Sequence, residues 1–223
     1  MSALVSAAPR GSAARLAGVL AAERIKLMSV RSPWWCAGLA VLGVIGLTAL
    51  YVLLETEDPA QGGSNPFLQF AMVLVMVLAA VSVTTEYRYS TIRTTFEAAP
   101  NRTLTMLAKA AVVAAACGLV GLVASFGAWA TVWLLLPGAD IALTTVDDWR
   151  MVAGAGVVFA TSAVLAIAVG ILVRHTAGAV SIVLVWVLLV EQLIAIIPVV
   201  GEQIQRWLPF LHAMNATGGG FDG

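Results

Sequence analysis

The sequence predicts an all-α integral membrane protein, a polytopic helical bundle with five spans in this chain. Of its 223 residues, 61% are hydrophobic and only 11% are charged, and the mean hydropathy is +0.96. Soluble domains are about one-quarter charged, so this balance indicates a membrane protein. The apolar residues also gather in long uncharged runs separated by short polar intervals, which is the pattern of helices that cross a bilayer.

Residues 1–32 divide into a tail and a helix. Residues 1–14 are rich in Ala and Ser and predict a flexible N-terminal tail, without the compact apolar core of a signal peptide. Residues 15–32 predict a helix that lies at the membrane surface with its cations toward lipid headgroups. Its apolar stripe would consist of Leu16, Val19, Leu20 and Leu27, with Glu23 inside the stripe. The alternative is a positively charged flank to the next span.

Residues 33–200 predict the transmembrane domain. A helix needs about 20 apolar residues to cross about 30 Å of hydrocarbon. The predicted spans are Trp34–Leu54, Phe67–Val83, Lys109–Leu136, Met151–Val173 and a fifth from Ala177 to Val190, which continues after Glu191 toward Val200. In the third span, Gly118, Gly121 and Gly127 would let another helix approach closely. Residues 201–223 then follow as an extracytoplasmic segment.

The distribution of Lys and Arg predicts the orientation of these spans, because cytoplasmic segments carry the excess of these residues. With a cytoplasmic N-terminus, most of the 12 cations fall on the inner side: Arg10, Arg15, Arg24, Lys26, Arg31, Arg88, Arg93, Arg102, Lys109 and Arg174. Only Arg150 and Arg206 fall outside. We therefore expect the interval between the second and third spans to be cytoplasmic.

That interval, residues 86–104, contains the longest polar stretch of the chain and predicts a short amphipathic helix over residues 90–99. Ser90 is a suitable N-cap, and Pro100 would end the helix because it has no N–H donor. One face of the helix would carry Tyr89, Ile92 and Phe96, with Arg93 beside it. Such a helix either binds a partner protein or lies flat on lipid. We favour the partner.

Local motifs for catalysis, metal binding and nucleotide binding are absent from the sequence. The chain lacks the phosphate-binding G-x-x-x-x-G-K-[ST] loop, H-E-x-x-H and G-x-S-x-G. Cys36 and Cys117 lie in apolar runs, away from other metal ligands. We therefore predict no catalytic, cofactor-binding or metal-binding residue in this chain. A net charge of zero without a Lys/Arg run also predicts no nucleic-acid partner.

Glu191 and the two histidines are the remaining polar residues of interest. Counting from Ala177 at 1.5 Å per residue places Glu191 about 21 Å into the bilayer, where an acid would be functional, for example in a gate. If the helix breaks at Glu191, its role is structural instead. We expect His175 and His212 to be polar residues at the boundary between the membrane and water. An intramembrane enzyme would have to use these groups, and they lack a partner at usable spacing.

Three pieces of the chain carry a resemblance to a known family. They are Glu23-x-x-Lys26-x-x-Ser29-Val30-Arg31-Ser32-x-Trp34, the stretch Thr85-Glu86-Tyr87-Arg88-Tyr89-Ser90-Thr91-Ile92-Arg93-Thr94-Thr95, and Glu191 followed by Trp207-Leu208-Pro209. Together they resemble the membrane (permease) subunit of an ABC-type-2 exporter, of the small kind common in actinobacteria. The second piece is the most specific, and the resemblance covers nearly the whole chain.

This resemblance implies both a mechanism and partners. It implies a location in the bacterial plasma membrane, an elbow helix at 15–32, and a cytoplasmic coupling helix at 90–99 that docks on a separate ATP-binding subunit. The contact residues would be Arg88, Tyr89, Ile92, Arg93 and Phe96. Two ATP-binding subunits, which hold ATP and Mg, would act on a permease dimer formed with a second copy or a homologous chain. ATPase activity would belong to those subunits, so this chain is not expected to be an enzyme.

The family usually has a sixth span, and residues 201–223 would precede it, so we expect a chain that lacks this span. The alternative function is a non-transporting membrane scaffold or regulatory subunit of such a complex, which a five-span chain would suit. The exported substrate does not follow from the resemblance, because carriers of very different cargo have similar apolar linings.

Overall fold

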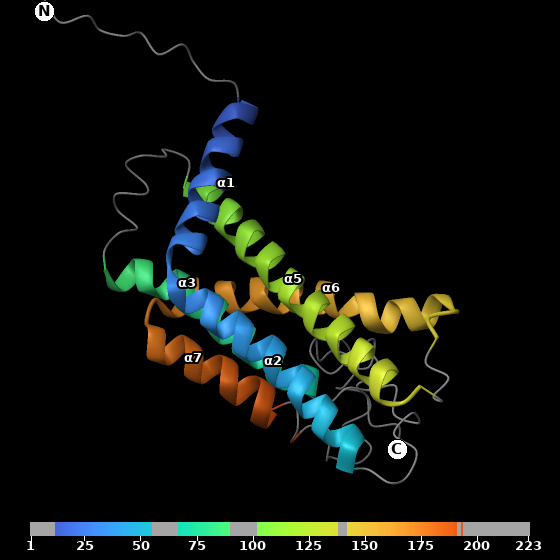
Figure 1. The fold of residues 1–223 in the computed structure, drawn as a ribbon. Helices are drawn as coiled ribbons and strands as arrows, with labels where there is room; N and C mark the ends of the chain where they lie inside the picture. Colours follow the sequence, from blue (N-terminus) through green and yellow to red (C-terminus); the bar gives the residue numbers. More distant parts are fainter. Residues whose placement is uncertain (1–11, 55–66, 90–101, 138–141, 191–192, 194–223) are drawn as a thin grey trace, which may run out of the picture.

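The computed structural model describes residues 12–54, 67–89, 102–137, 142–190 and 193 (Figure 1). Within these ranges the chain is helical and forms no strand. The helices are α1 (Ser12–Ser29), α2 (Arg31–Leu54), α3 (Phe67–Arg88), α5 (Arg102–Leu135), α6 (Val146–Val173) and α7 (Thr176–Val185), and a π-helical turn at Trp186–Val190 extends α7.

Four of these helices are long and apolar enough to cross a membrane. They are α2, α3, α5 and α6, with mean hydropathies between 2.2 and 2.5 over their most apolar windows. The fifth predicted span corresponds to a shorter apolar helix, Thr176–Val190, and its predicted continuation to Val200 lies outside the described residues apart from Leu193. The prediction of an all-α, multi-pass membrane protein is confirmed at this level.

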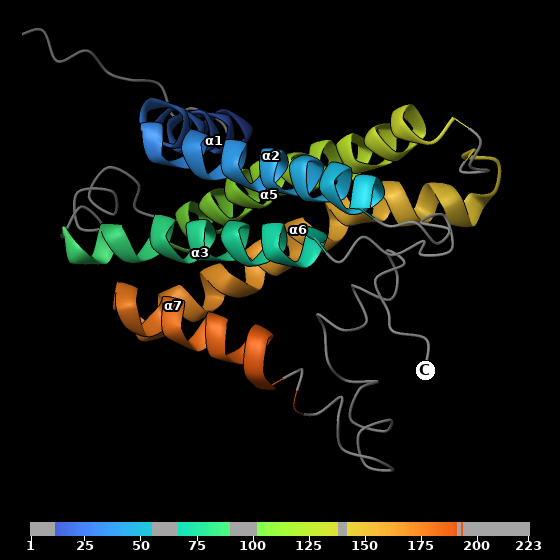
Figure 2. The ribbon, with the colours of Figure 1, turned by 60° about the horizontal axis from the view of Figure 1, so that its bottom comes forward.

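Helix α3 forms the centre of the bundle. It packs against α2, α5, α6 and α7, while α5 lies along α6 and α2 (Figures 1 and 2). Its apolar window is 56% buried, compared with 22% for α2. Met72 and Met76 from α3 are fully buried with Phe159 and Ile167 of α6. The core of the protein is therefore the contact between α3 and its neighbours.

Glycine brings α5 and α6 into close contact, as predicted for Gly118 and Gly121. A Cβ on Gly118 would lie 2.9 Å from the Gly156 carbonyl oxygen, and a Cβ on Gly121 would lie 2.5 Å from Phe159 Cγ. A Cβ on Gly127 would lie 2.7 Å from Ile45 Cδ1 of α2. The prediction that these glycines allow close helix approach is therefore confirmed, and they set the packing distance on two sides of α5.

Several helices extend beyond the predicted spans. Helix α1 begins at Ser12, so residues 12–14 are helical rather than part of a tail; the alanines in this stretch favour a helix. Helix α3 continues past Val83 to Arg88. Within this extension the Thr84 and Thr85 hydroxyls donate to the Ala80 and Val81 carbonyls at 3.0 and 2.8 Å, so these polar side chains find acceptors on their own helix.

Polar residues within or beside the predicted loops also begin helices. Helix α5 begins at Arg102 rather than Lys109. Helix α6 begins at Val146 rather than Met151, because Thr145 and Asp148 form a capping box. The Asp148 amide donates to Thr145 Oγ1 at 3.2 Å, and the Thr145 amide donates to Asp148 Oδ2 at 2.7 Å.

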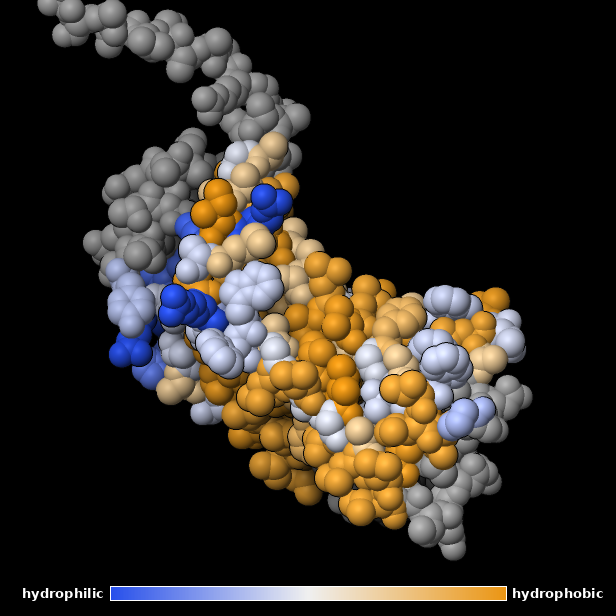
Figure 3. Space-filling view, viewed as in Figure 1, coloured by the Kyte–Doolittle hydropathy of each residue, from blue (hydrophilic) through white to orange (hydrophobic). Residues whose placement is uncertain are grey.

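The face of the bundle seen in Figure 3 is mainly apolar, and the strongly hydrophilic residues visible on it gather near one end. Exposed apolar side chains on α2 include Leu39, Leu42 and Leu53, each more than 60% exposed. In a soluble protein so large an apolar surface would lead to association. In a bilayer it is the surface that contacts lipid.

Candidate functional site

The described cations gather at one end of the bundle. Seven Lys and Arg side chains are described, and six of them lie near the junction of α1 and α2, the end of α3, the start of α5 or the turn after α6: Arg24, Lys26, Arg31, Arg88, Lys109 and Arg174. Arg150, near the start of α6, lies at the other end. The six described cations that were predicted to share one side of the membrane therefore share one end of the bundle.

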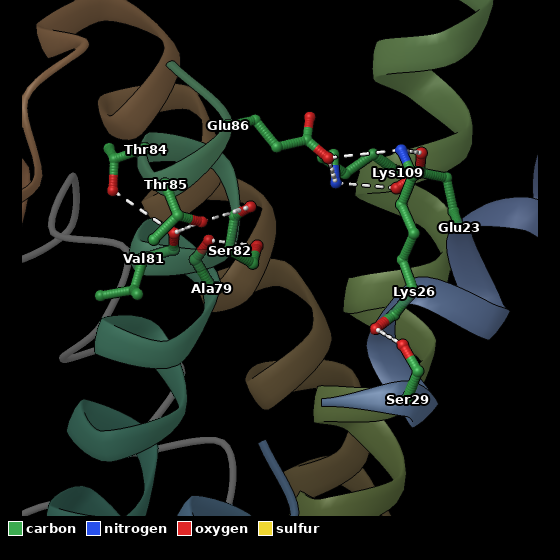
Figure 4. A network of polar contacts seen from close by, with 10 residues as sticks. All are labelled: Glu23, Lys26, Ser29, Ala79, Val81, Ser82, Thr84, Thr85, Glu86 and Lys109. Carbon is green, nitrogen blue, oxygen red and sulfur yellow. Dashed lines mark hydrogen bonds and ion pairs between the residues drawn. The ribbon is translucent and has the colours of Figure 1, made fainter. Parts of the chain in front are cut away.

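Four of the charged residues at this end form a closed ring, which we call the ion ring: Glu23 and Lys26 of α1, Glu86 of α3 and Lys109 of α5 (Figure 4). Lys109 Nζ lies 2.7 Å from Glu23 Oε2 and 2.9 Å from Glu86 Oε1. Lys26 Nζ lies 2.8 Å from Glu23 Oε1 and 3.4 Å from Glu86 Oε1. Acids and bases alternate, so each charge has two opposite neighbours.

Most of the ion ring is buried. The exposed fractions of the Glu23, Lys109 and Glu86 side chains are 4%, 6% and 13%, whereas Lys26 is 45% exposed. Removing an ion from water costs several kcal/mol even after the protein relaxes. The alternating arrangement offsets that cost because no charge in the ring is left without a partner. Lys109 is therefore the buried cation between two acids, and Lys26 closes the ring toward the surface.

The ring changes the proton affinity of the two groups on α1. Burial alone raises the pKa of the Glu23 carboxyl, but the hydrogen bonds and charges of Lys109 and Lys26 outweigh it and hold that pKa below its ordinary value. Burial alone lowers the pKa of Lys26, but Glu23 and Glu86 outweigh it and raise that pKa above its ordinary value. Both groups are therefore charged at neutral pH.

Helix geometry places the ring residues. Glu23 and Lys26 are three residues apart on α1 and so share a face. Glu23 lies in the apolar stripe of α1, and this stripe faces the protein: Leu27 packs on the core, and Val19 and Leu20 are half-buried. Helix α1 packs on α5 along this face, which brings Glu23 to Lys109.

The opposite side of α1 is exposed and mixed in character. Ile25 and Met28 are 63% and 54% exposed, and Arg24 is also exposed. The predicted location of α1 at a membrane surface stays a prediction. The fold adds that Glu23 is buried, that Leu27 packs against the core and that Val19 and Leu20 are half-buried, so this part of the predicted stripe contacts protein.

A second group of contacts lies at the end of α3. The Arg174 guanidinium lies 5.7 Å from the centre of the Tyr87 ring, and that of Arg88 lies 5.7 Å from the Tyr89 ring, within the range of cation–π attraction. Arg174 ends α6 in the left-handed conformation, with φ of 56°. His175 caps α7, and its Nδ1 accepts a hydrogen bond from the Gly178 amide at 3.3 Å, as suits a boundary residue.

The structure covers only part of the predicted contact set. Arg88 and Tyr89 lie at the end of α3, and Tyr89 is 68% exposed. Ile92, Arg93, Phe96 and Glu191 lie outside the described residues, as does the predicted helix over 90–99. Arg88 and Tyr89 thus belong to the same end of the bundle as the ion ring.

The ion ring itself was not predicted. The sequence placed Glu23 in an apolar stripe, Glu86 at the start of the polar interval and Lys109 among the inner-side cations, but it did not pair them. One feature of the sequence could have indicated the ring. An acid inside an apolar stripe is expected to be buried, and a buried carboxylate requires a cation as its partner. The sequence offers few cations on nearby helices, and Lys109 is one of them.

The ion ring provides electrostatic contacts between helices. It links α1 to α3 and α5, the two helices that flank residues 90–101.

No protein-family model matches this chain, and no curated protein matches it. The functional argument therefore depends on the geometry of this end of the bundle.

Proposed function

We propose that the chain is the permease subunit of an ATP-driven ABC exporter. It forms the translocation path as a dimer and couples to separate ATP-binding subunits through the helix predicted at 90–99. ATP and Mg belong to those subunits. The complex lies in the bacterial plasma membrane with the N-terminus of this chain in the cytoplasm.

The observation that carries this proposal is the ion pair between Glu86 and Lys109, at 2.9 Å. These residues belong to the two helices that flank the polar segment 90–101, so the pair fixes the base from which that segment leaves the bundle. The fixed base lies at the end of the bundle where the described cations gather. A segment that transmits motion from a cytoplasmic partner to the bundle requires a rigid attachment to the helices. If the attachment were flexible, the motion would be lost in the loop and would not reach α3 and α5.

The partner contact follows from the same placement. Arg88 and the exposed Tyr89 ring lie at the edge of the base, where they would extend the contact made by Ile92, Arg93 and Phe96. The few residues that dominate the binding energy of protein interfaces are enriched in Trp, Tyr and Arg. ATP-driven closure of two ATP-binding subunits would move the two segments of a permease dimer together and switch the path between inward- and outward-open states.

Co-purification tests this proposal. The tagged chain is co-expressed with candidate ATP-binding-cassette subunits from its source genome and purified in detergent. Phe96→Asp and Arg93→Glu should abolish recovery of the ATPase while membrane insertion is kept. Thr94→Asp is the matched control, because it adds the same charge two residues from Phe96, at a position that lies opposite Tyr89, Ile92 and Phe96 if residues 90–99 are helical.

Two outcomes decide between the alternatives. Full recovery of the ATPase with both Phe96→Asp and Arg93→Glu would rule out docking through this segment. A complex that forms normally but shows no ATP-dependent transport after reconstitution would favour the scaffold or regulatory function.

A further inference from the structure

We infer that the lipid bilayer covers this protein from the level of the ion ring to the level of two aromatic pairs at the opposite end of the bundle, and that Trp133 and Trp149 anchor that end. The partner of this aromatic surface is the glycerol-ester and headgroup layer of a phospholipid leaflet. The inference concerns the spanning helices alone, so it rests neither on the proposed function nor on which end is cytoplasmic.

Two pairs of aromatic rings join neighbouring helices at the end opposite the ion ring. Tyr51 of α2 and Phe67 of α3 lie edge to face with ring centres 6.1 Å apart, and the ring centres of Phe126 of α5 and Trp149 of α6 lie 6.3 Å apart. Tyr51 and Trp149 are 41% and 51% exposed. Each pair therefore combines packing between helices with ring surface that faces outward.

The ion ring gives a common starting point for measuring the height of these pairs, because Glu86 of α3 and Lys109 of α5 meet at 2.9 Å. At 1.5 Å per residue, Phe67 lies about 28 Å from Glu86 along α3, and Phe126 lies about 26 Å from Lys109 along α5. The residues between these limits carry no charge on either helix. Two helices that leave the same point thus reach an aromatic pair at nearly the same distance.

That distance fits the hydrocarbon core of a bilayer, which is about 30 Å thick. The helices are inclined to one another (Figures 1 and 2), so the thickness they cover is less than the length counted along them. On the face shown in Figure 3, the strongly apolar side chains lie between a hydrophilic end and a second, paler end. The apolar band therefore suits a bilayer of average thickness or slightly less.

Trp149 and Trp133 have the ring chemistry of residues at a membrane boundary. Trp149 stands between Asp148 and Arg150 in the chain, and such charged neighbours are costly deep in hydrocarbon. Trp133 is 59% exposed and lies about two turns beyond Phe126 on the same face of α5. An indole has an apolar body and an N–H donor, so it prefers the layer where lipid esters and headgroups supply acceptors.

A bilayer accounts for this arrangement more fully than a protein partner does. The two aromatic pairs belong to different pairs of helices, and another aromatic group, Trp34 and Trp35 of α2, is 59% and 78% exposed at the ion-ring end. Exposed rings at both ends of one apolar band are typical of membrane interfaces. A protein docked on one patch would not require equal heights on separate helices.

Spin labels on exposed positions measure the limits of the band. The full chain carries Cys36→Ala, which leaves the buried Cys117 as its one native thiol, and is reconstituted in phosphatidylcholine–phosphatidylglycerol vesicles. Labels are placed on Leu107→Cys, Leu119→Cys or Leu134→Cys of α5, positions that are 65%, 62% and 72% exposed. The ratio of collisions with oxygen to collisions with a water-soluble nickel chelate should be several-fold higher at Leu119 than at Leu107 or Leu134.

Removing the indoles tests their anchoring role. Trp133→Leu with Trp149→Leu keeps apolar side chains but removes both N–H donors. A label on Val146→Cys, a position 84% exposed at the start of α6, should then move toward the bilayer centre, and its collision ratio should rise. Phe126→Leu is the matched control, because it changes the ring beside Trp149 without removing a polar group, and it should leave the ratio unchanged.

A collision ratio at Leu134 as high as that at Leu119 would overturn the inferred limits, because the aromatic end would then lie in hydrocarbon. A label at Leu134 that neither reagent reaches, with spin–spin broadening, would mean that a second copy covers this surface instead of lipid. An unchanged ratio in the double tryptophan variant would contradict the anchoring role.

Two controls keep these outcomes separate from folding and from the proposed function. If the double variant does not give a monodisperse protein, Trp149→Phe replaces it, because it keeps a ring beside Phe126 and removes the N–H donor. All of these measurements use the chain without a partner. A failure to recover an ATPase subunit would therefore contradict the proposed function and leave the inferred limits unaffected.

Discussion

Glu23 and Lys109 form a 2.7 Å ion pair between α1 and α5 in which both side chains are more than nine-tenths buried. An N-terminal helix of a membrane protein is thus held to the bundle by charge rather than by its apolar stripe alone. Because the pair belongs to the ion ring, its loss affects Glu86 of α3 as well. The energetic and functional consequences of this arrangement can be measured one residue at a time.

Lys109→Met should be the most destabilising single change in the ring. It leaves Glu23 and Glu86 to share Lys26, and breaking a buried ion pair by removing one partner costs about 3–5 kcal/mol. Lys26→Met should cost far less, because Lys26 is 45% exposed and exposed pairs contribute about 0–1 kcal/mol. Thermal unfolding of the purified chain in detergent measures the difference. Equal losses in the two variants would contradict the buried position of Lys109.

Restoring the charge balance should recover part of the stability lost in Lys109→Met. Adding Glu23→Gln removes the excess negative charge and leaves Lys26 beside Glu86, at 3.4 Å in the intact ring. The double variant should therefore melt above Lys109→Met but below the unaltered chain. A double variant that melts lower still would show that each ring residue contributes independently, which the contact geometry contradicts.

Stability should fall at both extremes of pH through the α1 charges. The folded pKa of Glu23 lies below its ordinary value of 4.5, so its contribution is complete above about pH 4.5 and is lost as the pH falls through the folded pKa. The folded pKa of Lys26 lies above its ordinary value of 10.5, so its contribution is complete below about pH 10.5 and is lost as the pH rises through the folded pKa.

Melting temperatures across the acid and alkaline ranges measure these two limits. Glu23→Gln should reduce the fall of the melting temperature at acid pH (the acid limb), and Lys26→Met should reduce its fall at alkaline pH (the alkaline limb). Arg24→Gln, next to Glu23 but outside the ring, should leave both limbs unchanged. An acid limb that is identical with and without the Glu23 carboxyl would show that another group controls acid unfolding.

The sequence was sufficient for the spans but not for the contacts between them. Apolar runs located α2, α3, α5 and α6 because the need to cross hydrocarbon is a property of each segment alone. The pairing of Glu23 with Lys109 depends on which helices become neighbours, and the pattern of one helix gives a face but not the helix that covers it. An acid in an apolar stripe showed that a partner was needed without identifying it.

Helix ends were missed for a related reason. The limits of an apolar run mark where hydrocarbon ends, whereas a helix ends where its backbone groups find other partners. Thr145 and Asp148 form a capping box whose spacing can be read from the sequence, so the start of α6 was predictable. The extension of α3 to Arg88 was harder to predict from the sequence. It buries most of the Glu86 side chain, whose charge is compensated by Lys26 and Lys109 from other helices.

Packing between α5 and α6 predicts a sharp contrast between two glycines. In Gly121→Ala the added Cβ would lie 2.5 Å from Phe159 Cγ and 2.9 Å from the Ala155 carbonyl oxygen, and such overpacking costs about 1–3 kcal/mol. Gly43→Ala on α2 is the matched control, because beyond the neighbouring residues of its own helix no atom lies within 4 Å of its Cβ position. It should leave the melting temperature unchanged or slightly higher. A neutral Gly121→Ala would mean that α5 and α6 separate easily.

Labelling from each side of the membrane tests the orientation on which the proposed function depends. Tyr89 is 68% exposed at the end of the bundle where the cations gather, and Val146 is 84% exposed at the start of α6, near Arg150. In a Cys36→Ala chain, Val146→Cys should react with a membrane-impermeant maleimide in intact cells, because the side poor in Lys and Arg faces outward. Tyr89→Cys should react only after permeabilisation, which also provides the control for both positions. The reverse result would place the ion ring outside the cell, where no ATP-binding subunit could reach the 90–101 segment.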